Sequence, residues 1–241
     1  MPDMPDAIVL CGGAGLRLRS ITGDRPKSLA GVGSRPFLDL LLAQLARHGV
    51  TRAILAVGHR KEAICEHFAD YRGKPDLVYS AESSPLGTGG ALRKAVDLLE
   101  TESALVLNGD SYTDVNLKEF VAEHRESGAE VSLVVVHTDG RSDCGTVQFD
   151  QDCRIKSFAE KAAHTSFSYA NAGIYMISRR LLQSIPLGRP VSLEHEIFTL
   201  WLEQQEHLRA YVHGGTCTDI GTPDRYWKAQ EVLAEVGGRS G

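Results

Sequence analysis

Near its N-terminus the chain reads Ala7-Ile8-Val9-Leu10-Cys11-Gly12-Gly13-Ala14-Gly15-Leu16-Arg17-Leu18. The first four residues form a short apolar run, which is typical of a buried strand, and a glycine-rich turn follows directly. These glycines let the backbone turn tightly and bring its N–H groups close to an anion. Arg17 adds charged donors, and Lys27 supplies a second cation nearby in the sequence. The stretch therefore predicts an α/β fold with an anion-binding turn after its first strand.

The spacing of these glycines excludes two common phosphate-binding loops. A P-loop needs Gly-Lys-Ser or Gly-Lys-Thr after a four-residue gap, and that pattern is absent here. A dinucleotide-binding fingerprint would need glycine at position 18, where the chain has Leu18. An NAD-dependent oxidoreductase is therefore excluded. Taken alone, the segment is equally well explained as a plain tight turn.

The rest of the chain continues the alternation of strand and helix. Strands are expected at 7–10, 53–57, 77–79, 104–108 and 131–136, and then at 146–149, 155–158 and 171–177. Helices are expected around 37–45 with Gly49 as a C-terminal cap, at 61–68, at 91–99, from a cap at Asn116 to 127, and at 179–184, 193–203 and 223–236. We predict a Rossmann-like three-layer α/β sandwich with a mostly parallel mixed sheet, in which residues 1–241 form a single domain.

Composition restricts the partners of such a domain. The 241 residues are 42% hydrophobic and carry a formal net charge of −5, so we expect neither nucleic acid nor an anionic membrane as a partner. No apolar run approaches the roughly 18 residues that span a bilayer. The first residues have no basic segment typical of a secretory signal, and the five cysteines include no C-x-x-C pair. These features predict a cytoplasmic protein with reduced thiols and no zinc site. The oligomeric state stays open, a homo-oligomer included.

Asp110 follows a predicted buried strand, and Asp219 lies shortly before a predicted helix. The apolar run Leu105-Val106-Leu107 ends in Asn108-Gly109-Asp110, and ligands of open α/β sheets gather beyond the carboxyl ends of the strands. Asp219 precedes Ile220-Gly221-Thr222-Pro223. An acidic residue in such a place is often only a loop or helix cap, and here Thr222 with Pro223 also matches a helix start. We favour a metal-binding role for Asp110.

Several motifs together resemble the sugar-1-phosphate nucleotidyltransferases. The match comprises Gly12-Gly13-Ala14-Gly15-Leu16-Arg17-Leu18, then Pro26-Lys27, and later Pro85-Leu86-Gly87-Thr88-Gly89-Gly90-Ala91. The family usually has threonine where this chain has Leu16, which removes a hydroxyl near the phosphates. The resemblance implies that about 1–115 bind the nucleotide, that about 116–225 bind the sugar, and that a C-terminal helix spans about 223–236. The residues it places at the nucleotide are Leu10, Gly12, Gly13, Gly15, Arg17, Lys27, Glu82, Gly87, Thr88, Gly89 and Asp110.

The resemblance also implies a Mg²⁺ site and a sugar-phosphate site. Asp110 and Asp219 would bind the metal, since hard carboxylate oxygens together with triphosphate oxygens suit Mg²⁺. The stretch Ser157-Phe158-Ala159-Glu160-Lys161 matches the family's sugar motif. An isolated Glu-Lys pair is usually only a solvent-exposed pair without a functional role. Cys144 replaces a tyrosine of the family pattern. The residues implied for the sugar phosphate are Gly145, Glu160, Lys161, Asn171 and Thr222.

The expected substrates are a nucleoside triphosphate and a sugar 1-phosphate, with pyrophosphate as the second product. The sugar-phosphate oxygen is already an anion, so its attack on the α-phosphate needs no general base. The expected catalytic groups, which neutralise the repulsion between two polyanions, are Arg17, Lys27, Asp110, Lys161 and Asp219. Within the family, the glycine-rich motifs are most similar to those of the D-glycero-α-D-manno-heptose 1-phosphate guanylyltransferases. These enzymes make GDP-heptose for bacterial surface glycans. Alternatives are a mannose-1-phosphate guanylyltransferase, a uridylyl- or thymidylyltransferase acting on glucose or N-acetylmuramate 1-phosphate, and a non-catalytic nucleotide-sugar sensor.

Overall fold

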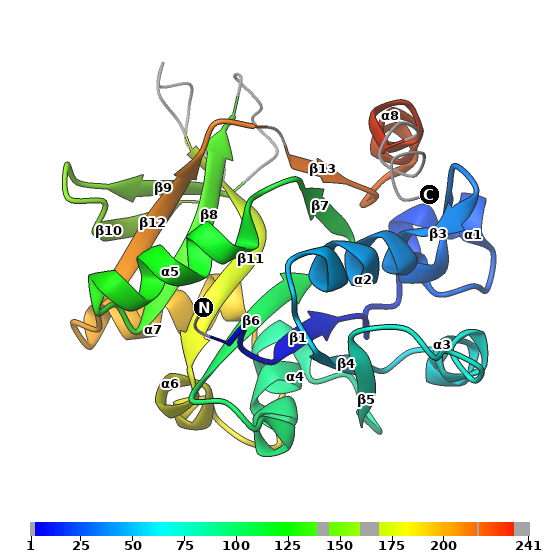
Figure 1. Ribbon diagram of the computed structural model, residues 1–241, viewed down its shortest axis with the longest axis horizontal. Helices are drawn as coiled ribbons and strands as arrows, with labels where there is room; N and C mark the ends of the chain where they lie inside the picture. The colour runs from blue at the N-terminus through cyan, green and yellow to red at the C-terminus, as the bar shows by residue number, and fades with distance from the viewer. Residues whose placement is uncertain (1–2, 139–144, 160–168, 216, 234–241) are drawn as a thin grey trace.

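The computed structural model describes residues 3–138, 145–159, 169–215 and 217–233 (Figure 1). Its centre is a mixed sheet with the strand order β10-β9-β11-β6-β1-β4-β5, and β8 and β12 extend it from β11. The strands of this sheet are β1 (Ala7–Leu10), β4 (Arg52–Val57), β5 (Asp76–Ala81), β6 (Ser103–Asn108), β8 (Val131–His137), β9 (Thr146–Phe149), β10 (Ile155–Ala159), β11 (Tyr169–Ser178) and β12 (Leu208–His213). The predicted fold class is confirmed, with β6-β1-β4-β5 parallel and β11 antiparallel to its neighbours.

Helices cover both faces of the sheet and bury two apolar clusters (Figure 1). One cluster includes side chains of α2 (Phe37–Arg47), α3 (Lys61–His67), α5 (Leu117–Ser127) and α8 (Pro223–Leu233). The other includes side chains of α4 (Gly87–Ala95), α6 (Arg179–Ser184) and α7 (Phe198–Glu203). Among the described residues, no helix combines the length and apolarity that a bilayer crossing requires.

Most element boundaries agree with the sequence-based expectations. Asn116 caps α5 by accepting from two backbone N–H groups of its first turn, and Gly49 ends α2 with a φ of 84°. The helix expected at 193–203 has a wider first turn, η4 (Leu193–Ile197), before α7. Helix α4 begins four residues before the expected position 91, at Gly87, and is followed by η3 (Val96–Leu98).

Several short strands and helices were not predicted from the sequence. Strands β7 (Ser111–Thr113) and β13 (Cys217–Asp219) have three residues each, too few for a periodic signal, and they are strands because they pair with each other. The same holds for the pair β2 (Gly31–Val32) and β3 (Arg35–Pro36). The glycine-rich turn runs into η1 (Leu16–Leu18), α1 (Arg19–Thr22) and later η2 (Lys27–Leu29). β12 was also missed, although buried Leu208 and Ala210 alternate with more exposed neighbours.

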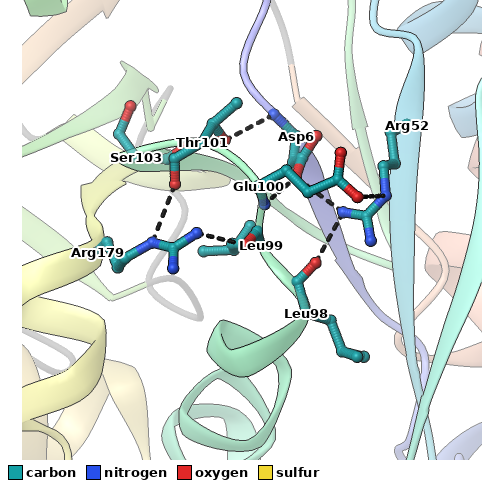
Figure 2. Close-up of polar contacts among 8 residues, drawn as sticks. All are labelled: Asp6, Arg52, Leu98, Leu99, Glu100, Thr101, Ser103 and Arg179. Carbon is teal, nitrogen blue, oxygen red and sulfur yellow. Dashed lines mark hydrogen bonds and ion pairs between the residues drawn. The ribbon is translucent and has the colours of Figure 1, made fainter.

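A polar network holds the sheet at the amino ends of its parallel strands (Figure 2). The buried Asp6 carboxylate accepts from Arg52 Nη1 at 2.8 Å and from the Glu100 backbone N–H at 2.7 Å. Arg52 Nη1 also donates to the Leu98 carbonyl at 2.7 Å. Because Asp6 precedes β1 and Arg52 opens β4, the network lies at the opposite end of these strands from the glycine-rich turn. It serves to join β1, β4 and the loop before β6.

The same loop is fastened to α6 by a second set of bonds (Figure 2). The Thr101 hydroxyl accepts from the Asp6 backbone N–H at 3.1 Å and donates to the Ser103 carbonyl at 2.8 Å. Arg179 donates to the carbonyls of Thr101 and Leu99. Main-chain carbonyls in and beside the loop before β6 thereby receive hydrogen bonds from side chains.

A buried histidine sits between α5 and β8. His124 Nδ1 lies 2.8 Å from Ser132 Oγ, and burial lowers the pKa of His124 to about 4. The charge of Arg125 lowers this pKa further, while Glu130 opposes the shift. The folded protein thus keeps this imidazole neutral under conditions in which the unfolded chain protonates it.

We expect His124 to lower the free energy of unfolding as the pH falls from about 6.5 to about 4. In that window the unfolded state binds the proton and the folded state does not, so acidification favours unfolding. Between pH 7 and pH 5 the free energy of unfolding should fall by about 2 kcal/mol more in the wild type than in His124→Gln. Urea titrations at both pH values measure this, with exposed His195→Gln as control. Equal losses in wild type and His124→Gln would contradict the assignment.

Candidate active site

A cavity of about 850 Å³ opens at the carboxyl ends of β1, β4, β5 and β6. Its walls are the glycine-rich turn, the turn after β4, the loop from β5 into α4, and the residues that follow β6. Ten of the eleven residues expected at the nucleotide line it: Leu10, Gly12, Gly13, Gly15, Arg17, Lys27, Glu82, Gly87, Thr88 and Asp110. Segments that are far apart in sequence thus converge on one space of a size suited to a small-molecule ligand.

Close backbone packing explains the glycines of the first wall. Gly15 has a φ of 60°, and a Cβ atom there would lie 3.0 Å from Cβ of Lys27. A Cβ at Gly109 would lie only 2.4 Å from the Leu10 carbonyl oxygen. The Gly12 carbonyl accepts from the His59 backbone N–H at 3.2 Å, which ties the first turn to the turn after β4. Glycine is therefore required at 15 and 109 to bring Lys27 and Asp110 to the end of β1.

The two predicted metal ligands are brought together by the β7–β13 pair. Asp110 precedes β7, and Asp219 ends β13 in register with Ser111. The Ile220 backbone N–H donates to the Asp110 carbonyl at 3.0 Å. Lys27 forms an ion pair with the Asp110 carboxylate. This pairing of short strands is the reason why aspartates so distant in sequence become neighbours.

Arg225 is a site residue that the sequence-based reading missed. Its Nη1 lies 3.2 Å from Oδ1 and 3.1 Å from Oδ2 of Asp219. It is held in place by the start of α8, where the Thr222 hydroxyl accepts from the Arg225 backbone N–H at 3.4 Å. Thr222 therefore caps α8, with Pro223 as the first helical residue. An arginine in the first turn after an Asp-x-Gly-Thr-Pro segment was the available signal.

The donor set at Asp110 and Asp219 fits Mg²⁺ that is shared with a nucleotide. Within the described ranges, no group of three or more His, Cys, Asp or Glu side chains forms a metal cage. Mg²⁺ typically binds through one or two carboxylates and takes its other ligands from water and substrate phosphates. Asp110 lines the cavity beside the glycine-rich turn, and Asp219 lies next to Gly221, which also lines it, so a metal site shared with a nucleotide stays a prediction for these two carboxylates.

Glu82 lies at the other end of the cavity, over two glycine backbones. A Cβ atom at Gly58 would lie 2.1 Å from Glu82 Oε1, and one at Gly12 would lie 3.1 Å from it. Glycine at position 58 therefore leaves room for the carboxylate. Its Oε2 accepts from the Leu86 backbone N–H at 3.2 Å. Burial raises the pKa of Glu82, while the Leu86 N–H and the charge of Lys94 oppose the shift. Gly58 and His59 were missed, although both directly follow an expected strand.

The second glycine-rich segment is fastened to the chain around η4. The Thr88 hydroxyl donates to Glu194 Oε2 and accepts from the Leu193 backbone N–H, both at 2.8 Å. The Gly89 backbone N–H donates to the Val191 carbonyl at 2.9 Å, and Gly89 does not line the cavity. These bonds hold the first turn of α4 in place, and a contact of Thr88 or Gly89 with a nucleotide stays a prediction.

Of the predicted sugar residues, Gly145 directly precedes β9, Asn171 lies in β11, and Thr222 directly precedes α8. Asn171 donates from Nδ2 to the Tyr175 hydroxyl at 2.8 Å and accepts at Oδ1 from the Gly173 backbone N–H at 2.9 Å. The Asn171 backbone N–H donates to the exposed Gly145 carbonyl at 3.4 Å. An amide has two donor hydrogens and two acceptor lone pairs, so Asn171 retains capacity for a ligand. Glu160 and Lys161, with Cys144, lie outside the described residues.

Comparisons with known proteins agree with this geometry. A profile of the family described as "Nucleotidyl transferase" matches residues 6–236. The chain is 32% identical over 231 residues to the D-glycero-alpha-D-manno-heptose 1-phosphate guanylyltransferase of Aneurinibacillus thermoaerophilus, covering 95% of this chain and 98% of that protein. It is 33% identical over 230 residues to the mannose-1-phosphate guanylyltransferase of Mycobacterium tuberculosis, covering 95% of this chain but only 64% of that relative.

A solved structure has the same fold over almost the whole chain. HddC from Yersinia pseudotuberculosis, complexed with GMP-PN, superposes with a TM-score of 0.84 at 28% sequence identity. The match covers 95% of this chain and 100% of that one.

Proposed function

The chain belongs to the nucleotidyl transferase family, and from that premise we propose that it transfers a guanylyl group from GTP to a sugar 1-phosphate. Support comes from the guanylyltransferase relatives and from the cavity. The cavity is lined by the glycine-rich turn, by the cations Arg17 and Lys27, and by the carboxylates Glu82 and Asp110. The products are a GDP-sugar and pyrophosphate.

The observation that carries the choice of guanine is the Glu82 carboxylate on the cavity wall. An ionised carboxylate only accepts hydrogen bonds, and each of its oxygens can accept more than one. Guanine presents two adjacent donors on its Watson–Crick edge, N1–H and the N2 amino group, whereas the other bases place an acceptor beside each donor. A carboxylate therefore pairs with guanine through two parallel bonds. Oε1 of Glu82 occupies the space left by the missing side chains of Gly58 and Gly12, and Oε2 accepts from the Leu86 backbone N–H.

The reaction follows from the charges around the opposite end of the cavity. An oxygen of the sugar phosphate attacks the α-phosphorus of GTP, and the bond to the bridging oxygen of pyrophosphate breaks as the new P–O bond forms. Arg17 and Lys27 neutralise the phosphates and hold them in line, and Lys161 holds the incoming sugar phosphate. Asp110 and Asp219 would hold Mg²⁺, which would spread the negative charge of the phosphate oxygens.

For the sugar, we propose D-glycero-α-D-manno-heptose 1-phosphate, with mannose 1-phosphate as the alternative. Support comes from the heptose-specific relative, which is 32% identical over 95% of this chain, and the mannose-specific relative, 33% identical over the same share, supports the alternative. The product would be GDP-heptose for a surface polysaccharide, made in the cytoplasm where nucleoside triphosphates are available.

Glu82→Gln tests the proposed reading of guanine. The amide replaces one acceptor oxygen by a donor, so the ratio of kcat/KM for GTP over UTP should fall about 10- to 100-fold, as expected for the loss of a two-bond contact. Initial rates with each nucleotide at a fixed sugar 1-phosphate concentration measure this ratio. Exposed Glu126→Gln on α5 is the control. An unchanged ratio in Glu82→Gln would mean that the base is recognised by other residues.

A further inference from the structure

Each of the two carboxylates assigned to the metal already has a cation of its own. Lys27 is paired with Asp110, and Arg225 contacts both oxygens of Asp219. The two pairs meet at Gly221. A Cβ atom there would lie 2.8 Å from Asp219 Oδ1, 3.7 Å from Arg225 Nη1 and 3.8 Å from Lys27 Nζ. Asp219, Arg225 and Lys27 thus lie around one glycine that lines the cavity, and Lys27 is also paired with Asp110.

Each of these two carboxylates faces a cation before any ligand arrives. Their attraction for a divalent ion is therefore opposed by the two neighbouring positive charges. A metal between the carboxylates would also lie close to the Lys27 ammonium and the Arg225 guanidinium, which repel it. The exposed fractions of the Arg225 and Asp219 side chains are only 24% and 19%, so water screens this pair incompletely.

We propose that Arg225 is a positioning residue that makes metal binding depend on the nucleotide. It holds the Asp219 carboxylate in place and occupies its charge while the cavity contains no triphosphate. The phosphates would then add negative charge beside these cations, give Lys27 a second partner, and bring the divalent ion as part of a metal–nucleotide complex. The inference rests on the proposed function, because it takes Asp110 and Asp219 as the metal ligands.

The test is the binding of Mn²⁺ to the full-length, nucleotide-free protein, followed by electron paramagnetic resonance of the unbound ion. Arg225→Gln keeps a hydrogen-bonding side chain but removes the charge, and it should bind Mn²⁺ at least tenfold more tightly than the wild type. Arg225→Lys retains the charge and should bind it as weakly as the wild type. Arg180→Gln, which removes an exposed arginine paired with Glu206, is the matched control and should change nothing. With a non-hydrolysable GTP analogue, the wild type should bind Mn²⁺ tightly and its difference from Arg225→Gln should shrink.

Two results would overturn this inference alone. One is equal Mn²⁺ affinity of the nucleotide-free wild type and Arg225→Gln, while both bind the ion with the analogue. The other is equal tightening by Arg225→Lys and Arg225→Gln, which would assign the effect to geometry and not to charge. If the wild type binds no Mn²⁺ even with the analogue bound, the metal site in the proposed function is wrong, and this inference is overturned with it.

Discussion

Asp110→Asn should lower kcat for guanylyl transfer by about 10²–10³, which is typical for losing one preorganised charged contact at a reacting phosphate. The asparagine has nearly the same shape, so packing around the end of β6 is retained. What it removes is the negative charge that faces Lys27 and, in our account, one of the two protein ligands of the metal. Steady-state release of pyrophosphate at saturating substrates measures the loss.

Asp114→Asn is the matched control for this substitution. Asp114 follows β7, forms an ion pair with Arg47 at 2.6 Å, and has a 67% exposed side chain outside the cavity. Its replacement should leave kcat within a factor of two of the wild type. If Asp110→Asn kept more than a third of wild-type activity, Asp110 would not be the metal ligand.

The largest expected effect on stability comes from Asp6→Ala, at the opposite end of the sheet. The substitution leaves Arg52 and the Glu100 N–H without their buried acceptor (Figure 2). Breaking a buried ion pair by removing one partner usually costs about 3–5 kcal/mol. We expect about 3 kcal/mol, the low end, because the Leu98 carbonyl still accepts from Arg52.

Urea denaturation followed by circular dichroism measures the loss in Asp6→Ala. Asp76→Ala, which breaks the exposed pair with Lys74, should cost less than about 1 kcal/mol. A loss below about 1 kcal/mol in Asp6→Ala as well would show that the network contributes little to folding. Molecules that remain folded should keep their kcat, since the network lies away from the cavity.

The sequence allowed much of the sheet and its ligand edge to be predicted, because parallel strands leave strong local signals. The apolar run that ends at Leu10 is followed by Cys11 and the glycine-rich turn, and the apolar run that ends at Leu107 is followed by Asn108, Gly109 and Asp110. Once they are read as neighbouring parallel strands, their carboxyl ends must meet at one edge. Register between Leu10 and Asn108 confirms that placement.

Contacts between distant segments could not be predicted in the same way. The pairing of β13 with β7 is decided by tertiary packing, and it alone brings Asp219 next to Asp110. The position of Glu82 over Gly58 depends on the parallel register of β4 and β5. The amide of Asn171 bonds within β11, where the register shifts between Asn171 and Tyr175 and Gly173 has a φ of 75°, and a contact of Asn171 with a sugar stays a prediction. No local sequence pattern predicts such a register shift.

The most direct test of the central claim is pyrophosphate release from GTP, ATP, UTP and dTTP in turn, each with heptose, mannose and glucose 1-phosphates and Mg²⁺. We expect turnover with GTP, the highest kcat/KM with the heptose 1-phosphate, and loss of that turnover in Asp110→Asn. No release from any pair, while GTP still binds in calorimetry, would contradict this claim. The chain would then be a nucleotide-sugar-binding protein that has kept the fold without the reaction.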